Sequence, residues 1–300
     1  MDTDLDTLAT TLHVTVDDLL AAHPERLPER PGVGFFPKTS DSEIITLAVL
    51  QVLLDYHDER RWIRHVKLHL ACWFPRVPNQ PGYNKRLREL ARTLVLVSQV
   101  LAASTDQWSD GVWVVDSTPV ECGRSRETAK RSEVAGWAEY GYCASHTRYF
   151  WGLRPRLARA LSGLVVGFGL GGAKGDEREA LCWILSGLER GPGQTIIADK
   201  AYYGKGFEAD LESQDLVLLR KARKSERPRP GARYFKPLRQ VIESINDTLK
   251  TRLSLELHGG RTVAGVCARV AQRILALNAV VWFNELCGAP VLRSLTAYDH

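Results

Sequence analysis

Three acidic residues occupy positions from which carboxylates could share a metal ion. Asp116 follows the apolar run 112–115, and Asp199 ends a second short apolar run. Short runs rich in Val and Ile and bounded by turn residues predict buried strands. Glu243 lies within residues 238–245, which read as a helix. If these elements bring the carboxylates together, each pair about 5 Å apart repels by roughly 3 kcal/mol unless a divalent cation neutralises it.

Two metal ions bridged by carboxylates are the usual apparatus for in-line phosphoryl transfer on nucleic acid. A single Asp at a strand end also serves as a turn or helix cap, so a structural interpretation stands beside the catalytic one. The neighbours of Glu243 favour catalysis. Four polar residues share one face of this helix at spacings of four, three and four: Arg239, Glu243, Asn246 and Lys250. The alternative for this face is a solvated stripe of ion pairs.

The distribution of charge favours a nucleic-acid partner. The chain has 300 residues and a net charge of +5. The Asp, Glu, Lys and Arg side chains of residues 60–92 are all basic except Glu89, and those of residues 220–239 are all basic except Glu226. Such runs suit a phosphate backbone, although an isolated run is often only a solvated surface. Two runs flanking one acidic constellation favour DNA binding.

Cysteine usage and hydropathy predict a cytosolic protein. None of the six cysteines forms a Cys-x-x-Cys pair or has a His at zinc spacing, which argues against a structural zinc. The sequence shows neither a signal peptide nor a long apolar segment. We therefore expect a cytoplasmic, nucleoid-associated protein with reduced, buried thiols and no membrane contact.

The chain divides into a helical part, residues 1–110, and a mixed part, residues 111–300. In the first, Ser40 or Asp41 can cap a helix, and residues 60–70 and 83–102 predict two more. Short basic helices are compatible with a DNA-binding helix-turn-helix and with plain helical packing.

The second part predicts an α/β fold, in which strands alternate with helices. We expect strands near 112–116, 148–153, 163–168, 194–199 and 215–219, and helices near 175–190, 203–213 and 238–254. Two hairpin-like strands followed by strand–helix alternation are the order of an RNase H-like mixed sheet with flanking helices.

Several motifs carry a family resemblance over nearly the whole chain. They are DSTPVECGRS at 116–125, AGW at 135–137 with YGYC at 140–143, IADKAY at 197–202, RQVIESIN at 239–246, HGGRT at 258–262 and LTAYDH at 295–300. With them the chain resembles bacterial DDE transposases, and among these it is most similar to insertion sequence family 982. One departure is Lys236, which stands where many relatives carry a Tyr.

The resemblance implies an RNase H-like catalytic domain behind a helical N-terminal domain. It implies that Asp116, Asp199 and Glu243 are catalytic and hold two Mg²⁺ ions, with Mn²⁺ as a substitute. The implied DNA- and phosphate-binding residues are Arg239, Lys250, Asn246, Arg124, Arg126 and Lys200. The implied reaction is cleavage at the ends of a bacterial insertion sequence and joining of the 3′-hydroxyl to target DNA. The implied partners are the terminal inverted repeats, target DNA and further copies of the chain in a dimer or larger assembly.

The segment 154–162 departs from the family pattern. Pro155 removes a ladder donor, and the run is rich in Arg and Ala where an alternating strand is usual. We expect an irregular or frayed segment beyond Leu153, with regular pairing resuming near Leu164. This departure keeps open the alternative of an inactive DNA-binding remnant. A second alternative, independent of this segment, is an RNase H-like nuclease without strand transfer.

Overall fold

The computed structural model describes residues 3–29, 37–143, 147–188, 191, 193–224, 226–231 and 235–290. The chain forms two compact units. A helical unit combines Met1–Leu101 with Leu249–Ala289, and a sheet unit contains Ala102–Thr248. Residues 249–289, predicted to belong to the mixed part that begins at 111, group instead with the N-terminal helices.

The helical unit is built from amphipathic and apolar helices. They are α1 (Thr3–Ala22), α2 (Asp41–Leu53), α3 (Glu59–His69), α4 (Gln80–Glu89), α5 (Ala91–Ala103) and α10 (Val263–Leu286), with 3-10 turns at Pro24–Arg26 and Leu255–Leu257. Ser40 caps α2 as predicted, because its hydroxyl accepts from the Glu43 amide at 3.0 Å in a reciprocal capping box. The single helix predicted over 83–102 is instead two helices separated at Leu90.

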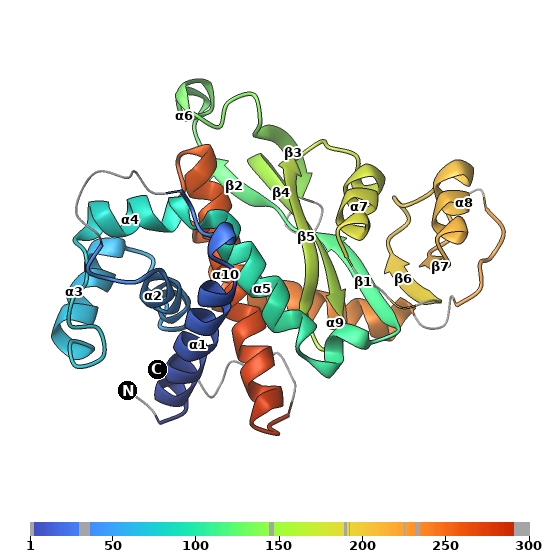
Figure 1. The fold of residues 1–300 in the computed structure, drawn as a ribbon. Helices are drawn as coiled ribbons and strands as arrows, with labels where there is room; N and C mark the ends of the chain where they lie inside the picture. Colours follow the sequence, from blue (N-terminus) through green and yellow to red (C-terminus); the bar gives the residue numbers. More distant parts are fainter. Residues whose placement is uncertain are drawn as a thin grey trace. The chain divides into compact units, whose positions relative to one another are not determined.

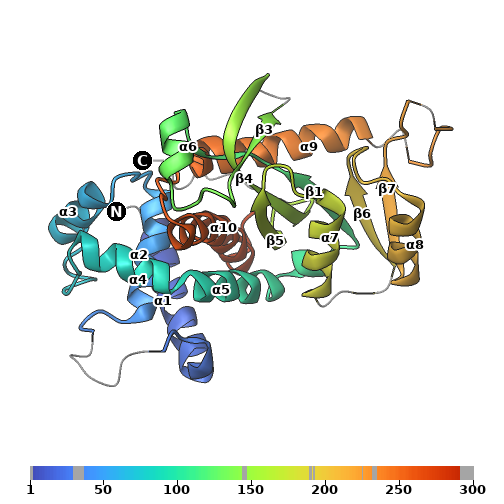
Figure 2. The same ribbon diagram turned by 90° about the horizontal axis from the view of Figure 1, so that it is seen from above.

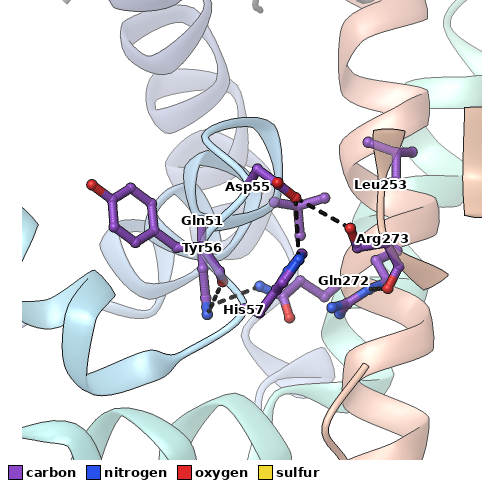
Figure 3. A pocket seen from close by; sticks show the side chains of 9 residues that line it. Gln51, Asp55, Tyr56, His57, Leu253, Gln272 and Arg273 are labelled. Carbon is purple, nitrogen blue, oxygen red and sulfur yellow. Dashed lines mark hydrogen bonds and ion pairs between the residues drawn. The ribbon is translucent and has the colours of Figure 1, made fainter. Parts of the chain in front are cut away.

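A buried polar network crosses the core of the helical unit between α2 and α10. Gln272 donates to the Ala48 carbonyl at 2.7 Å, and Arg269 donates to Gln272 at 2.8 Å. Figure 3 shows Gln51 of α2 facing Gln272 and Arg273 of α10 across a small pocket. Burial lowers the pKa of Arg269 to about 10 and that of Arg273 to about 9.

The prediction that the chain has no long apolar segment is wrong at α10. The helix has the length and composition of a membrane span, and it is the one such helix among the described residues. Its most apolar stretch is almost wholly buried inside the protein, as expected of a core helix. This burial explains why α10 belongs to the helical unit.

The sheet unit contains a seven-stranded mixed sheet (Figure 1). Its strands are β1 (Val112–Ser117), β2 (Val120–Gly123), β3 (Glu139–Cys143), β4 (Arg148–Ala160), β5 (Val165–Gly172), β6 (Gln194–Ala198) and β7 (Leu216–Arg220). β4 is antiparallel to β1 and β5, while β1, β6 and β7 run parallel. The ladder β5-β4-β1-β6-β7 fits the expected RNase H-like sheet, with β2 and β3 added along the first half of β4.

Helices cover both faces of this sheet. They are α6 (Arg126–Arg131), α7 (Glu177–Ser186), α8 (Lys205–Ser213) and α9 (Phe235–Asp247), with a 3-10 turn at Asp106–Ser109 before β1. A π-helical turn at Thr248–Arg252 follows α9 and leads into the helical unit. Figure 2 shows α7 and α9 on opposite sides of the central strands. Phe235 of α9 packs on Val114 and Ile197, while Gly167 of β5 leaves room for Ile184 of α7.

The prediction that 154–162 is irregular is wrong. β4 is continuous to Ala160, pairing with β1 over 156–160 and with β5 over 153–159. The Pro155 carbonyl accepts from the Thr118 amide at 3.2 Å. In an antiparallel ladder the amide and carbonyl of one residue point the same way, so the missing donor of Pro155 falls in the gap between the end of β1 and the start of β2.

Two arginines of β4, Arg156 and Arg159, are buried with partners. Arg156, 2% exposed, donates to the carbonyls of Gly172 and Gly175 at 3.3 and 2.5 Å. Gly171 makes this geometry available, since a Cβ there would lie 2.7 Å from the Arg156 guanidinium. The Arg-rich run is therefore an ordered part of the sheet, and it no longer argues for an inactive copy.

The expectation of buried thiols holds for only one cysteine. All six are free: Cys143 is buried, Cys122 and Cys267 are half-buried, and Cys72, Cys182 and Cys287 are exposed. Burial raises the pKa of Cys122 to about 11.

An ion-pair cluster joins α8 to the end of β7, and it predicts acid sensitivity. Arg220, 2% exposed, donates to Glu208 at 2.7 Å and to Glu226 at 2.7 Å. The Arg220 hydrogen bond, helped by the Arg223 amide, lowers the pKa of Glu226 from 4.5 to about 2. A depressed carboxyl pKa contributes stability above its unfolded value, and this stability is lost as the pH falls from about 4.5 towards 2.

Arg220→Met should therefore lower the Tm at pH 7 by on the order of 5 °C. It should also flatten the pH dependence of Tm between pH 4.5 and 2. Thermal unfolding followed by circular dichroism measures both effects, with Arg227→Met as an exposed control. An unchanged acid profile in Arg220→Met would contradict the assignment.

Candidate active site

Adjacent parallel strands bring the two predicted aspartates to one edge of the sheet. β1 and β6 pair with Val114 opposite Ile197. Continuing this register by two residues sets Asp116 opposite Asp199. Since the carboxyl ends of parallel strands share one edge, the structure brings together the two residues that the sequence singles out at strand ends.

Asp116 is held from two elements. Asn246 of α9 donates its side-chain amide to Asp116 Oδ2 at 2.7 Å. Arg159 of β4, wholly buried, lies 3.9 Å from the same oxygen and donates to Asn246 Oδ1 at 2.9 Å. The predicted phosphate ligand Asn246 thus has both ends of its side chain engaged inside the sheet unit.

Asp199 begins the turn that follows β6. Its Oδ1 accepts from the Ala201 amide at 2.6 Å. The Tyr202 amide also bonds back to the Asp199 carbonyl, at 3.4 Å. The turn fixes the Asp199 carboxylate and folds Tyr202 back into the protein, while Lys200 between them stays exposed.

Tyr202 is buried beside this edge of the sheet and is affected by the charges of three carboxylates. The residue is 1% exposed, and its hydroxyl has no hydrogen-bond partner in the described structure. Its pKa is raised well above 10, first by burial and then by the negative charges of Glu177, Asp116 and Asp199. A buried hydroxyl among three anionic side chains marks a polar site rather than a packed core.

Glu177 is a residue of this site that the sequence analysis missed. It opens α7, whose N-cap Asp176 accepts from the Arg178 amide at 2.8 Å. The Ser117 hydroxyl donates to Glu177 at 2.9 Å and accepts from Arg154 at 3.1 Å. Burial raises the pKa of Glu177, and the charge of Asp199 raises it further, against the opposing Ser117 hydrogen bond. The signal in the sequence is the acidic pair Asp176-Glu177, which directly follows the turn after β5.

Glu243 lies on α9, exposed, one helical turn before Asn246. Residues three apart share a helix face, so Glu243 and the Asp116-binding Asn246 point to the same side of α9. Within the described residues, however, no three His, Cys, Asp or Glu side chains are close enough to hold a metal ion. In the structure Asp116 and Asp199 lie at one sheet edge, and Glu177 is hydrogen-bonded to Ser117 at the end of β1. The position of Glu243 on the Asn246 side of α9 is the structural feature that relates it to this site.

The other predicted DNA-binding residues are spread more widely. Arg126 starts α6, and Arg124 pairs with Glu121 at 3.4 Å; both arginines are exposed. The side chain of Arg239 lies outside the described side chains, and Lys250, on the π-helical turn, belongs to the helical unit.

An open cleft of about 610 Å³ borders the carboxylates. Its lining includes Glu177 and Asp199 together with the cations Arg154 and Lys174. Arg154 also donates to the Tyr142 carbonyl at 2.8 Å, which ties β3 to the end of β1 through Ser117. The lining of this cleft thus combines carboxylates, which suit metal ions, with cations, which suit phosphate.

Comparison with known proteins gives one family match. No curated protein and no solved structure matches the chain significantly. The family model described as a transposase DDE domain matches residues 107–262, which cover β1 to the turn before α10 and include Asp116, Asp199 and Glu243. The match spans more than half of the chain and the whole candidate site. The chain belongs to the DDE transposase family.

Proposed function

We propose that the chain is the DNA transposase of a bacterial insertion sequence, cutting at the element ends and joining the freed 3′-hydroxyl to target DNA. The observation that carries the proposal is that the parallel strands β1 and β6 bring Asp116 and Asp199 to one edge of the sheet, inside the region that matches a transposase DDE domain. Its proposed partners are the terminal inverted repeats, target DNA and further copies of the chain in a dimer or larger assembly.

The donor set fits divalent metal. Carboxylate oxygens are the ligands that Mg²⁺ and Mn²⁺ prefer, and a cluster of them without a cation is electrostatically unfavourable. We assign Asp116, Asp199 and Glu243 as the metal ligands, with Glu177 as a fourth carboxylate beside them. When bound, two such ions activate the attacking oxygen and stabilise the leaving oxygen of an in-line phosphoryl transfer.

The protein's own groups position the carboxylates and the DNA. Arg159 and Asn246 both contact the Asp116 carboxylate, so the orientation of this carboxylate is set before DNA binds. Arg154 and Lys200 can contact phosphate oxygens near the carboxylates, with Arg124, Arg126, Arg239 and Lys250 proposed for more of the backbone. No side chain serves as a nucleophile, because the reaction uses water and then the DNA 3′-hydroxyl.

A strand-transfer assay tests this function. The full chain is incubated with labelled duplexes made from the DNA that flanks its coding sequence, in Mg²⁺ or in EDTA. The proposal expects Mg²⁺-dependent cuts that free a 3′-hydroxyl, followed by joined products with a supercoiled target plasmid. Cutting without joining would instead support a nuclease, and binding without cutting would support an inactive remnant.

Metal alone should stabilise the fold. A ligand at 100 times its Kd adds about 2.7 kcal/mol, which raises the Tm by roughly 5 to 10 °C for a domain of this size. Thermal unfolding in Mg²⁺ or Mn²⁺ against EDTA measures the shift. Asp116→Asn should remove most of it, and Glu177→Gln should reduce it. A wild-type Tm that does not respond to either metal would contradict a shared site.

A further inference from the structure

The turn His258–Thr262 lies outside the sheet unit that carries Asp116 and Asp199. It lies in the helical unit, directly before α10, and carries the sequence His-Gly-Gly-Arg-Thr. It lines a cavity of about 460 Å³ together with the start of α3 and with Gln80, Asn84, Leu87 and Arg88 of α4. Every residue of this cavity is described and belongs to the helical unit.

Two glycines allow the turn to lie close against the start of α10. Gly259 has a φ of +68°, a backbone conformation that favours glycine. A Cβ on Gly260 would lie 2.8 Å from the Val266 amide nitrogen, so only glycine fits there. The Gly260 amide donates to the buried His258 ring at 3.0 Å, and Thr262 caps the helix through the Gly265 amide at 3.0 Å. The wall of the cavity is therefore a fixed stretch of backbone.

The cavity carries an excess of positive charge. Arg60 of α3, Arg88 of α4 and Arg261 of the turn line it, and none forms an ion pair with a residue that the structure describes. The Arg88 Nε is buried and has no hydrogen-bond partner among the described atoms. Three arginines without counter-ions around one cavity favour an anionic ligand.

The acidic residues of the cavity are already engaged. Asp58 caps α3 by accepting from the Arg61 amide at 2.8 Å. The Glu59 carboxylate is paired with the buried Arg269 and accepts from Gln80 at 2.6 Å and Asn84 at 2.8 Å. His57, a third titratable group of the lining, lies 3.7 Å from Asp55. The charges of Arg60, Arg88 and Arg261 thus remain available to a ligand.

We infer that this cavity is a phosphate-binding cradle through which the helical unit grips the DNA backbone. Guanidinium groups match phosphate oxygens in a forked geometry, and the first turn of a long helix adds a favourable dipole. The contacts hold phosphate rather than base edges, so the cradle contributes affinity without sequence preference. DNA as the source of the phosphate rests on the proposed function.

The test measures DNA affinity as a function of salt, in Ca²⁺ so that no cleavage interferes. Arg261→Ala and Arg88→Ala should each weaken binding of a fluorescent duplex roughly threefold to tenfold near 0.1 M salt. Each should also reduce the slope of log K against log salt by about 1, equally for unrelated sequences. Arg261→Lys keeps the charge and should lose less affinity.

Arg26→Ala is the matched control, since Arg26 is an exposed arginine of the same unit that lies outside the cavity and pairs with Glu25. Unchanged slopes in both cavity variants, with the wild-type Tm retained, would overturn the cradle even if strand transfer is found. A smaller slope of log K against log salt in Arg261→Ala and Arg88→Ala would support the cradle even if the chain cuts no DNA. Inorganic phosphate forms a second arm: stabilisation that depends on Arg88 and Arg261, with DNA affinity unaffected, would overturn the DNA part of the inference.

Discussion

Asp116→Asn and Asp199→Asn should each reduce cleavage and strand transfer by at least roughly 10²–10³-fold, the effect of removing one strong electrostatic contributor to a transition state. Each change removes a metal ligand while altering little volume. Each also removes a negative charge beside the phosphate chain, so DNA binding should be retained or become tighter. A loss of activity without a loss of binding is the expected signature of a catalytic carboxylate.

Single-turnover cleavage in Mg²⁺ and fluorescence anisotropy in Ca²⁺ measure the two properties on the same duplex. Asp210→Asn provides the control, because it makes the same chemical change at an exposed residue of α8 in the same unit. Near-normal strand transfer in Asp116→Asn or Asp199→Asn would show that the residue is wrongly assigned.

The same assay separates the roles of Glu243 and Glu177. Glu243→Gln should match the aspartate variants if Glu243 is a metal ligand on α9. Glu177→Gln should cost about 10- to 100-fold if Glu177 supports the metal site from beside it. If Glu177→Gln is the more damaging of the two, the third ligand comes from α7 rather than α9.

The strands that carry the site could be predicted because their signals are local. The runs 112–115 and 195–198 are rich in β-branched residues, and each is followed by an aspartate at the strand end. The capping signal at Ser40 likewise located the start of α2. Such elements depend on neighbours in sequence, so a single chain reveals them.

Residues whose role depends on distant contacts could not be predicted in the same way. Glu177 and Tyr202 belong to the site only because the start of α7 and the turn after β6 lie near the same sheet edge. The interpretation of Pro155 failed for a related reason. A proline is poorly tolerated in a central strand only where its missing amide faces a partner, and at Pro155 it faces the gap between β1 and β2.

The strand β4 also reverses an expectation about stability. If residues 154–162 were a defect, apolar replacements of the arginines would stabilise the protein. In the structure Arg159 is wholly buried, donates to Asn246 at 2.9 Å and lies 3.9 Å from Asp116. Removing one partner of a buried pair leaves the other uncompensated, at a cost of about 3–5 kcal/mol.

Arg159→Leu should therefore destabilise the fold, by about 2–3 kcal/mol once the partial exposure of Asp116 is taken into account. Urea unfolding in EDTA measures the loss, with Arg126→Leu on exposed α6 expected within about 0.5 kcal/mol of wild type. Mg²⁺ should narrow the gap, because a cation beside Asp116 replaces part of the missing charge. An increase in stability would instead support the interpretation of residues 154–162 as a defect. It would also contradict the proposal that Arg159 orients the Asp116 carboxylate.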